Sequence, residues 1–124
     1  MDLIIGGAYQ GKLDYARETY HLKESDIFTC EGTEIDFSRT AVYGLERFTL
    51  ACIRAEKDPA QYIKEHEAQW TDSVLICEDI FCGVVPLGAE MRQWRQQTGR
   101  LCQYLSGKAR RVSRIFCGLE QRLK

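Results

Sequence analysis

The sequence predicts an α/β protein with a mainly parallel central sheet flanked by helices. Short apolar runs alternate along the chain with longer segments in which apolar residues recur at helical spacing. The runs within residues 3–5 and 72–80 have continuous apolar centres, which are typical of strands buried on both faces. A length of 124 residues suffices for one hydrophobic core, so we expect a single domain over residues 1–124.

Each element follows from the local pattern. Apolar runs bounded by glycine or polar residues predict strands, and apolar residues three or four apart predict helices. Asp58 before Pro59 predicts a capped helix start. The predicted elements are a strand at 3–5, a helix at 11–22, strands at 27–29 and 41–43 around a loop at 31–39, helices at 45–53 and 59–70, a strand at 72–80, a helix at 88–107, and a final strand or hairpin within 110–124.

The formal net charge of -1 hides an imbalance near the C-terminus. Residues 92–124 hold nine Lys/Arg side chains and one acid, Glu120. They form either a solvated basic face or a positive rim that attracts phosphates. Aromatic residues do not interleave with these charges, so nucleic acid is not an expected partner. No apolar run approaches the ~20 residues of a membrane span, and we expect a cytoplasmic protein.

Six cysteines occur, and none forms a C-x-x-C pair or has the spacing of a zinc finger or ribbon. Most lie in apolar stretches, where a thiol behaves as a small core residue. We therefore interpret them as reduced cytosolic thiols. They are Cys30, Cys52, Cys77, Cys82, Cys102 and Cys117.

The residues after the first strand, "GGAYQGKL", match the phosphate-binding pattern G-x-x-x-x-G-K. Glycines let backbone N–H groups converge on a phosphate, and the following helix offers the positive end of its dipole. The pattern favours a P-loop nucleotide-binding fold over a plain glycine turn. The predicted phosphate contacts are Gly6, Gly7, Ala8, Tyr9, Gln10, Gly11, Lys12 and Leu13.

Leu13 occupies the position where a serine or threonine normally ligates Mg²⁺. A leucine has no oxygen for this cation, so phosphate binding can survive while efficient phosphoryl transfer becomes doubtful. Glu78 and Asp79, at the end of the predicted strand 72–80, are weak candidates for metal ligands, or else belong to a solvated strand end. Lys12 and Asp79 are the candidate catalytic residues.

The segment "CGVVPLGAEMRQWRQQTGRLCQ" and the glycine loop carry a family resemblance. They are similar to G-x-G-I-V-P, R-x-F-R-x-x-x-G-x-x-N-Q and G-G-x-x-S-G-K-S-x-x-A of the adenosylcobinamide kinase/adenosylcobinamide-phosphate guanylyltransferase family. Residues 30–70 do not align. The matching residues are Gly83, Val84, Val85, Pro86, Arg92, Trp94, Arg95, Gly99 and Gln103, with Ala16 in the loop and Val112, Gly118 and Lys124 at the end.

The resemblance implies a P-loop fold that uses ATP or GTP, with Mg²⁺, to phosphorylate a cobinamide-type substrate in cobalamin biosynthesis. Members of the family then transfer GMP through a guanylylated histidine, and they often assemble as trimers. A homo-oligomer is therefore expected here.

The chain departs from the family at several positions. Gln10 and Leu13 replace loop serines, and Tyr43 stands where the family has a magnesium-binding acid, with Glu46 three residues along. His66, in "YIKEHEAQW", only superficially matches the family's histidine motif, so we interpret it as an exposed helix residue. His21 is expected at the surface, and guanylyl transfer is expected to be lost.

These observations lead to two hypotheses about the function. The leading hypothesis is a shortened relative of this family that retains a purine-nucleotide site and residual ATP- or GTP-dependent kinase activity. The alternative is a non-catalytic nucleotide-binding or oligomeric assembly protein, with Arg92, Trp94 and Arg95 on an oligomer surface. Trp94 at helical spacing is also typical of a core residue.

Overall fold

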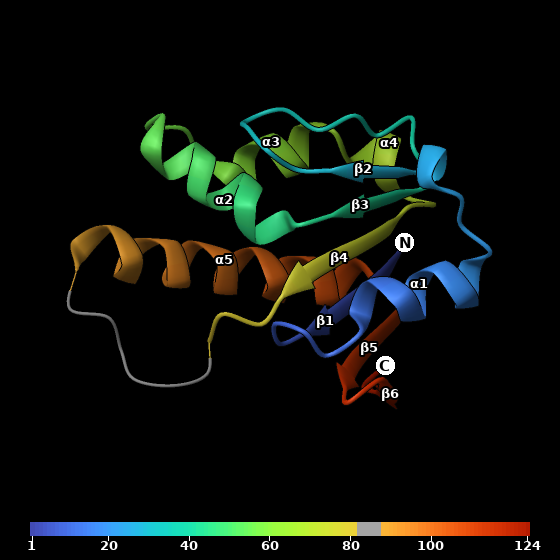
Figure 1. Ribbon diagram of the computed structural model, residues 1–124. Helices are drawn as coiled ribbons and strands as arrows, with labels where there is room; N and C mark the ends of the chain where they lie inside the picture. The colour runs from blue at the N-terminus through green and yellow to red at the C-terminus, as the bar shows by residue number, and fades with distance from the viewer. Residues whose placement is uncertain (82–87) are drawn as a thin grey trace.

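The computed structural model describes residues 1–81 and 88–124, and there strands and helices alternate as predicted (Figure 1). Cys82 and the family match at Gly83, Val84, Val85 and Pro86 lie outside the described residues. In chain order the elements are β1 (Asp2–Gly6), α1 (Lys12–Tyr20), a 3₁₀ turn (Glu24–Asp26), β2 (Ile27–Thr29), β3 (Ala41–Tyr43), α2 (Leu45–Arg54), α3 (Pro59–Glu65), α4 (Glu67–Trp70), β4 (Val74–Glu78), α5 (Ala89–Lys108), β5 (Arg111–Phe116) and β6 (Leu119–Arg122).

The six strands form one sheet in the order β2-β3-β4-β1-β5-β6. The strands β1 to β5 run parallel to one another, and β6 runs antiparallel to β5. The prediction of an α/β protein with a mainly parallel sheet is confirmed. The apolar runs of β1 and β4 are continuous because these strands lie at the centre of the sheet, with helices over both faces.

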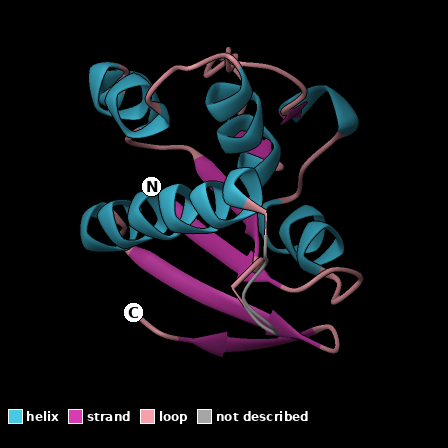
Figure 2. Ribbon diagram, turned by 90° about the vertical axis from the view of Figure 1, so that its left-hand side faces the viewer, coloured by secondary structure: helices cyan, strands magenta, loops and turns pink. Residues whose placement is uncertain are grey.

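The two faces of the sheet are covered unequally. On one face, Leu3 and Leu75 pack against Phe48 of α2, Ile63 of α3 and Leu105 of α5 in the larger core cluster. The other face carries a smaller cluster built around α1. The long helix α5 and the single helix α1 therefore lie on opposite sides of the sheet (Figures 1 and 2).

The helix predicted over residues 59–70 is wrong in one respect, because α3 and α4 are separate helices. The predicted start is confirmed, since Oδ1 of Asp58 accepts the amides of Ala60 and Gln61 at 3.0 and 3.3 Å. The chain leaves helical geometry at His66 (φ −102°, ψ 15°). Trp70 is buried and donates its indole N–H to the carbonyl of Ile63 at 2.8 Å, so α4 turns its end into the core.

The described cysteines Cys30, Cys52, Cys77, Cys102 and Cys117 are free, and all but Cys117 are buried. Burial raises the pKa of Cys30 to about 12 and the pKa of Cys52 to about 11. These two thiols therefore act as core residues, as predicted, and are poor nucleophiles. Within the described ranges, no helix has the length and apolar character needed to cross a membrane.

Candidate functional site

The carboxyl ends of β1 and β4 lie side by side, and the connections that leave these two strands run toward opposite edges of the sheet. These strands are neighbours, with Gly6 opposite Glu78, and the helices that follow them, α1 and α5, lie on opposite faces. In open α/β sheets such a switch point forms a crevice that receives ligands. The glycine loop, defined as residues 6–13, starts in this crevice.

The loop has a tight conformation that its glycines permit. A Cβ on Gly6 would lie 3.0 Å from the carbonyl oxygen of Ile115, and Gly11 has a φ of 90°. Gln10 ties the loop to the turn between β5 and β6, because its side-chain oxygen accepts the N–H of Cys117 at 2.7 Å. Its own carbonyl accepts the N–H of Gly118 at 2.8 Å. Two hydrogen bonds at Gln10 therefore fasten the loop to this turn.

Lys12 is the first residue of α1, and its side chain is buried beneath the loop, with 5% of the residue exposed. Its Nζ donates to the carbonyl of Gly7 at 3.2 Å and lies 3.6 Å from Oε1 of Glu78. A buried ammonium group is costly unless it is paired, so these two acceptors explain how the lysine is tolerated. The sequence prediction placed Lys12 and Glu78 in one site, and the structure brings them together.

A cavity of about 590 Å³ opens beside the loop, and we call it the loop cavity. Leu13 contributes a half-buried apolar wall to it and offers no oxygen ligand. The amides at the start of α1 have no acceptor inside the helix. The cavity is lined by Ala8, Tyr9, Gly11, Lys12, Leu13, Asp14, Tyr43, Arg47 and Glu78.

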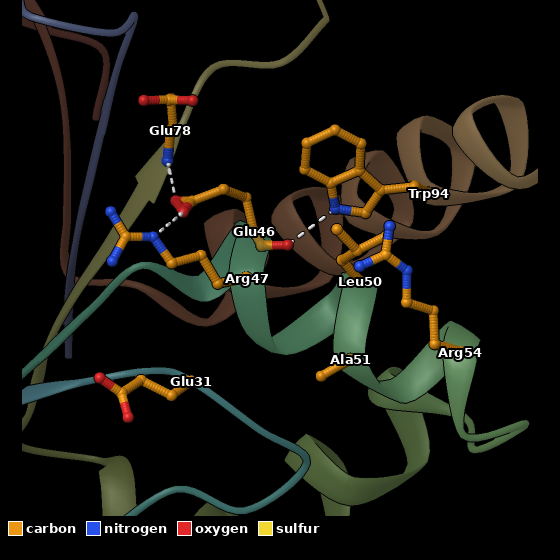
Figure 3. Close-up of a pocket in the computed structure, with 8 residues that line it drawn as sticks. All are labelled: Glu31, Glu46, Arg47, Leu50, Ala51, Arg54, Glu78 and Trp94. Atoms are coloured by element: carbon orange, nitrogen blue, oxygen red, sulfur yellow. Dashed lines mark hydrogen bonds and ion pairs between the residues drawn. The ribbon is translucent and has the colours of Figure 1, made fainter.

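A second cavity, of about 480 Å³, adjoins the first, and we call it the side cavity (Figure 3). Arg47 and Glu78 line both cavities, so the two share a common wall. Arg47 also places its guanidinium 5.4 Å from the ring centroid of Tyr43. The remaining side-cavity residues are Glu31, Glu46, Leu50, Ala51, Arg54 and Trp94.

Glu46, the second residue of α2, was noted in the sequence only as an acid three residues after Tyr43, and its contacts in this site were not predicted. Only 6% of it is exposed, and its Oε1 accepts the amide of Glu78 at 2.8 Å while Oε2 lies 3.7 Å from Nε of Arg47. Figure 3 shows its carboxylate between these two partners. Glu46 thus fixes the end of β4 and places Arg47. The signal in the sequence is an acid in the first turn of a helix that follows a strand.

Trp94 of α5 forms part of the side-cavity wall and is half-buried, which lies between the core and surface positions considered from the sequence. Its indole N–H reaches the carbonyl of Glu46 at 2.7 Å and Oγ1 of Thr49 at 3.1 Å. These polar partners hold the ring at the boundary between core and cavity. Of its two neighbours in the matched motif, Arg92 is exposed and Arg95 is half-buried.

Asp79 lies on the other side of the loop from its neighbour Glu78. Its Oδ1 accepts the amide of Phe81 at 3.0 Å, and it lines a separate cavity of about 150 Å³ with Gly7, Gln10 and Arg114. Glu78 is therefore the acid of the predicted pair that lines the loop cavity. Among the described residues, no group of three or more His, Cys, Asp or Glu side chains could hold a metal ion.

Both histidines lie away from the two cavities. His66 is half-buried, so its expected exposure is wrong, because its ring stacks on Tyr62 with centroids 4.1 Å apart. Its Nδ1 lies 2.7 Å from the carbonyl oxygen of Tyr62. His21 is exposed, as predicted, and ends α1 with a φ of 54°.

Most of the basic C-terminal segment does not surround the loop. Arg110 pairs with Asp2 at 3.7 Å and Lys108 with Glu67 at 3.1 Å, and both lie near the amino ends of β1 and β5. Arg114 is nearer, in the small cavity with Asp79. This arrangement favours the solvated basic face over a positive rim.

No protein-family model matches the chain, and no curated protein matches it significantly. The family resemblance of the sequence therefore stays a prediction.

Proposed function

We propose that the chain binds the phosphate tail of a purine nucleoside triphosphate, ATP or GTP, in the loop cavity. The observation that supports this most is the buried side chain of Lys12 beneath a glycine loop that leads into the first turn of α1. An ammonium group, converging amides and a helix N-terminus together form a site for several negative charges.

The loop cavity has the volume and setting for such a ligand. Its size of about 590 Å³ falls within the range of small-molecule sites. The loop is already anchored through Gln10, so little conformational entropy is lost when a ligand binds. The exposed ring of Tyr9, at the loop tip, is available to contact the bound nucleotide.

Magnesium has a smaller role in this proposal than in a typical loop of this kind. Leu13 supplies no ligand, and Glu78 is the cavity acid next to Lys12. Where Mg²⁺ is bound, Glu78 and phosphate oxygens would hold it, since this cation prefers carboxylate and phosphate ligands. Nucleotide binding itself then depends mainly on Lys12 and the loop amides.

Residual kinase activity is the second candidate, and the shared wall of the two cavities favours it. An acceptor hydroxyl in the side cavity would reach the phosphate tail past Arg47 and Glu78. Arg47 would stabilise charge on the transferred group, and Lys12 would hold the tail. A cobinamide-type acceptor follows only from the family resemblance, and the non-catalytic alternative keeps the same nucleotide site without this step.

Isothermal titration calorimetry with ATP, GTP and inorganic tripolyphosphate, each with Mg²⁺ and with EDTA, tests the proposal. We expect binding in both conditions, and Lys12→Ala should weaken it roughly 10- to 100-fold, because hydrogen bonds to charged groups contribute about 1.5–3 kcal/mol. Arg100→Ala, an exposed cation on α5, is the matched control and should bind normally. No heat with any of these ligands at millimolar concentration would refute the proposal.

A transfer assay separates the two candidates. Radiolabelled ATP or GTP is incubated with cobinamide, and phosphorylated product is measured for the wild type and Lys12→Ala. Product that disappears with Lys12→Ala supports the kinase. Tight binding without product supports the non-catalytic nucleotide-binding protein.

A further inference from the structure

The strand β6 forms one edge of the sheet, as Figure 2 shows at the C-terminal end of the chain. It pairs with β5 on one side and with no strand of the described chain on the other. All four of its residues are exposed. Three large apolar side chains on or beside this hairpin are also exposed: Phe116 (57%), Leu119 (72%) and Leu123 (56%).

The backbone groups at the open edge can be identified. Leu123 donates its N–H to the carbonyl of Val112 at 2.8 Å, so it faces β5. Backbone groups of successive residues point to opposite sides of a strand. Leu119 and Gln121 therefore also face β5, while Glu120 and Arg122 direct N–H and C=O outward.

These directions restrict how a second β6 could pair in antiparallel fashion. Opposed residues of such a pair are either both hydrogen-bonded or both not, so outward-facing residues must oppose one another. Three registers through these residues are possible: Glu120 against Glu120, Arg122 against Arg122, or Glu120 against Arg122. The first two place like charges opposite, which is destabilising, and the third pairs unlike charges twice.

We propose that β6 is the contact surface for a second copy of this chain, in a two-fold antiparallel pair centred on Gln121. In this register the outward groups of Glu120 and Arg122 form the ladder hydrogen bonds. Leu119 of each copy then lies opposite Leu123 of the other, which covers these two exposed apolar side chains. The two sheets join into one, and the unpaired edge disappears.

The charges needed for this pairing are present in the single chain. Glu120 accepts hydrogen bonds from Arg111 and, at 2.7 Å, from Ser113, so its carboxylate is oriented on one face of the hairpin. Arg122 has Nε 3.0 Å from the carbonyl of Lys124 and is otherwise exposed. The assembly is a dimer, which differs from the trimer implied by the family resemblance.

Disulfide trapping tests the register. Gln121→Cys is made in a variant that lacks the exposed Cys117 (Cys117→Asn) and Cys82 (Cys82→Ser), and copper phenanthroline is added as oxidant. Because the two Gln121 residues form a non-hydrogen-bonded pair, we expect a covalent dimer on a non-reducing gel. Gln96→Cys, exposed on α5, is the control and should stay monomeric on the gel. Equal cross-linking of both variants would overturn the proposal.

Sedimentation velocity over a concentration series tests the charges. Arg122→Glu places four acids together and should raise the dimer dissociation constant roughly tenfold or more, whereas Arg100→Glu makes the same charge change on α5 and should leave it unchanged. Thermal melts check that both variants fold. The proposal would be overturned if the protein had a monomeric mass at about millimolar concentration or formed a trimer. It would also be overturned if Arg122→Glu left the dimer dissociation constant unchanged.

Discussion

Nζ of Lys12 lies 3.6 Å from Oε1 of Glu78, and both side chains line the loop cavity. The carboxylate compensates a buried cation in the unliganded chain. It also stands where it would repel an incoming phosphate tail. In the proposed site, Glu78 would therefore determine how phosphate binding responds to Mg²⁺.

Replacing Glu78 by glutamine should strengthen triphosphate binding in EDTA by roughly tenfold, because it removes a negative charge that lies 3.6 Å from Nζ of Lys12, the group proposed to bind the phosphates. Mg²⁺ should strengthen binding to the wild type but not to Glu78→Gln, since the variant lacks the carboxylate that would help hold the cation. Calorimetry in EDTA and in Mg²⁺ measures both effects.

Asp79→Asn is the matched control for this variant. The two acids are adjacent in sequence, but Asp79 lines the small cavity on the other side of the loop. We expect wild-type affinity and wild-type Mg²⁺ dependence from Asp79→Asn. The reverse outcome, in which Asp79→Asn changes the affinity and its Mg²⁺ dependence while Glu78→Gln changes neither, would support the sequence-based prediction of Asp79.

Leu13→Ser should make nucleotide binding more dependent on magnesium. The new hydroxyl supplies the missing ligand at the start of α1, so Mg²⁺ should increase the affinity for ATP or GTP roughly tenfold more than it does for the wild type. Because Leu13 is half-buried, we also expect a loss of about 1 kcal/mol in the free energy of unfolding. Identical magnesium responses in titrations of the two proteins would argue against this role of the position.

Glu46→Ala should destabilise the fold by about 1–3 kcal/mol, because the amide of Glu78 loses its acceptor inside the protein. Glu46→Gln keeps a side-chain oxygen at the same place and should lose less than half as much. Urea denaturation of the three proteins measures the free energies. Equal losses for both variants would mean that the charge of Glu46, rather than its hydrogen bond, is what matters.

The pair between Arg111 and Glu120 predicts a pH-dependent contribution to stability. The Arg111 guanidinium, and then the Ser113 hydroxyl, lower the pKa of Glu120 from 4.5 to about 2. A lowered pKa means that the stabilisation is complete above pH 4.5 and is lost as the pH falls toward 2. It should amount to about 1 kcal/mol at most, since the pair is largely solvent-exposed.

Comparison with Glu120→Gln isolates this contribution. The difference in the free energy of unfolding between wild type and variant should shrink as the pH is lowered from about 6 to about 2.5. Urea denaturation at several pH values within this range gives the two curves. A difference that stays constant would mean that the ion pair contributes nothing.

The sequence predicts the fold well because its signals are local. The apolar runs of β1 and β4 and the Asp58 cap each depend on neighbouring residues, and all three are confirmed. The break at His66 could not be predicted, because it depends on Trp70 turning into the core through a bond to Ile63. Tertiary packing, rather than helix propensity, decides that boundary.

The site is only partly predictable. The glycine loop and Lys12 are visible as a contiguous pattern, whereas the choice between Glu78 and Asp79 depends on which side of β4 each one faces. The contacts of Glu46 could not be predicted for a different reason. Its partner, the amide of Glu78, is distant in sequence, and only the pairing of β3 with β4 brings the two together.

The most direct test of the phosphate site is a titration of ¹⁵N-labelled protein with inorganic tripolyphosphate, followed by amide chemical shifts. If the loop amides bind phosphate, the largest shifts should occur at residues 8–13, and Lys12→Ala should reduce them. Shifts confined to the basic residues of β5 and β6, or no shifts in the loop at saturating ligand, would contradict the account.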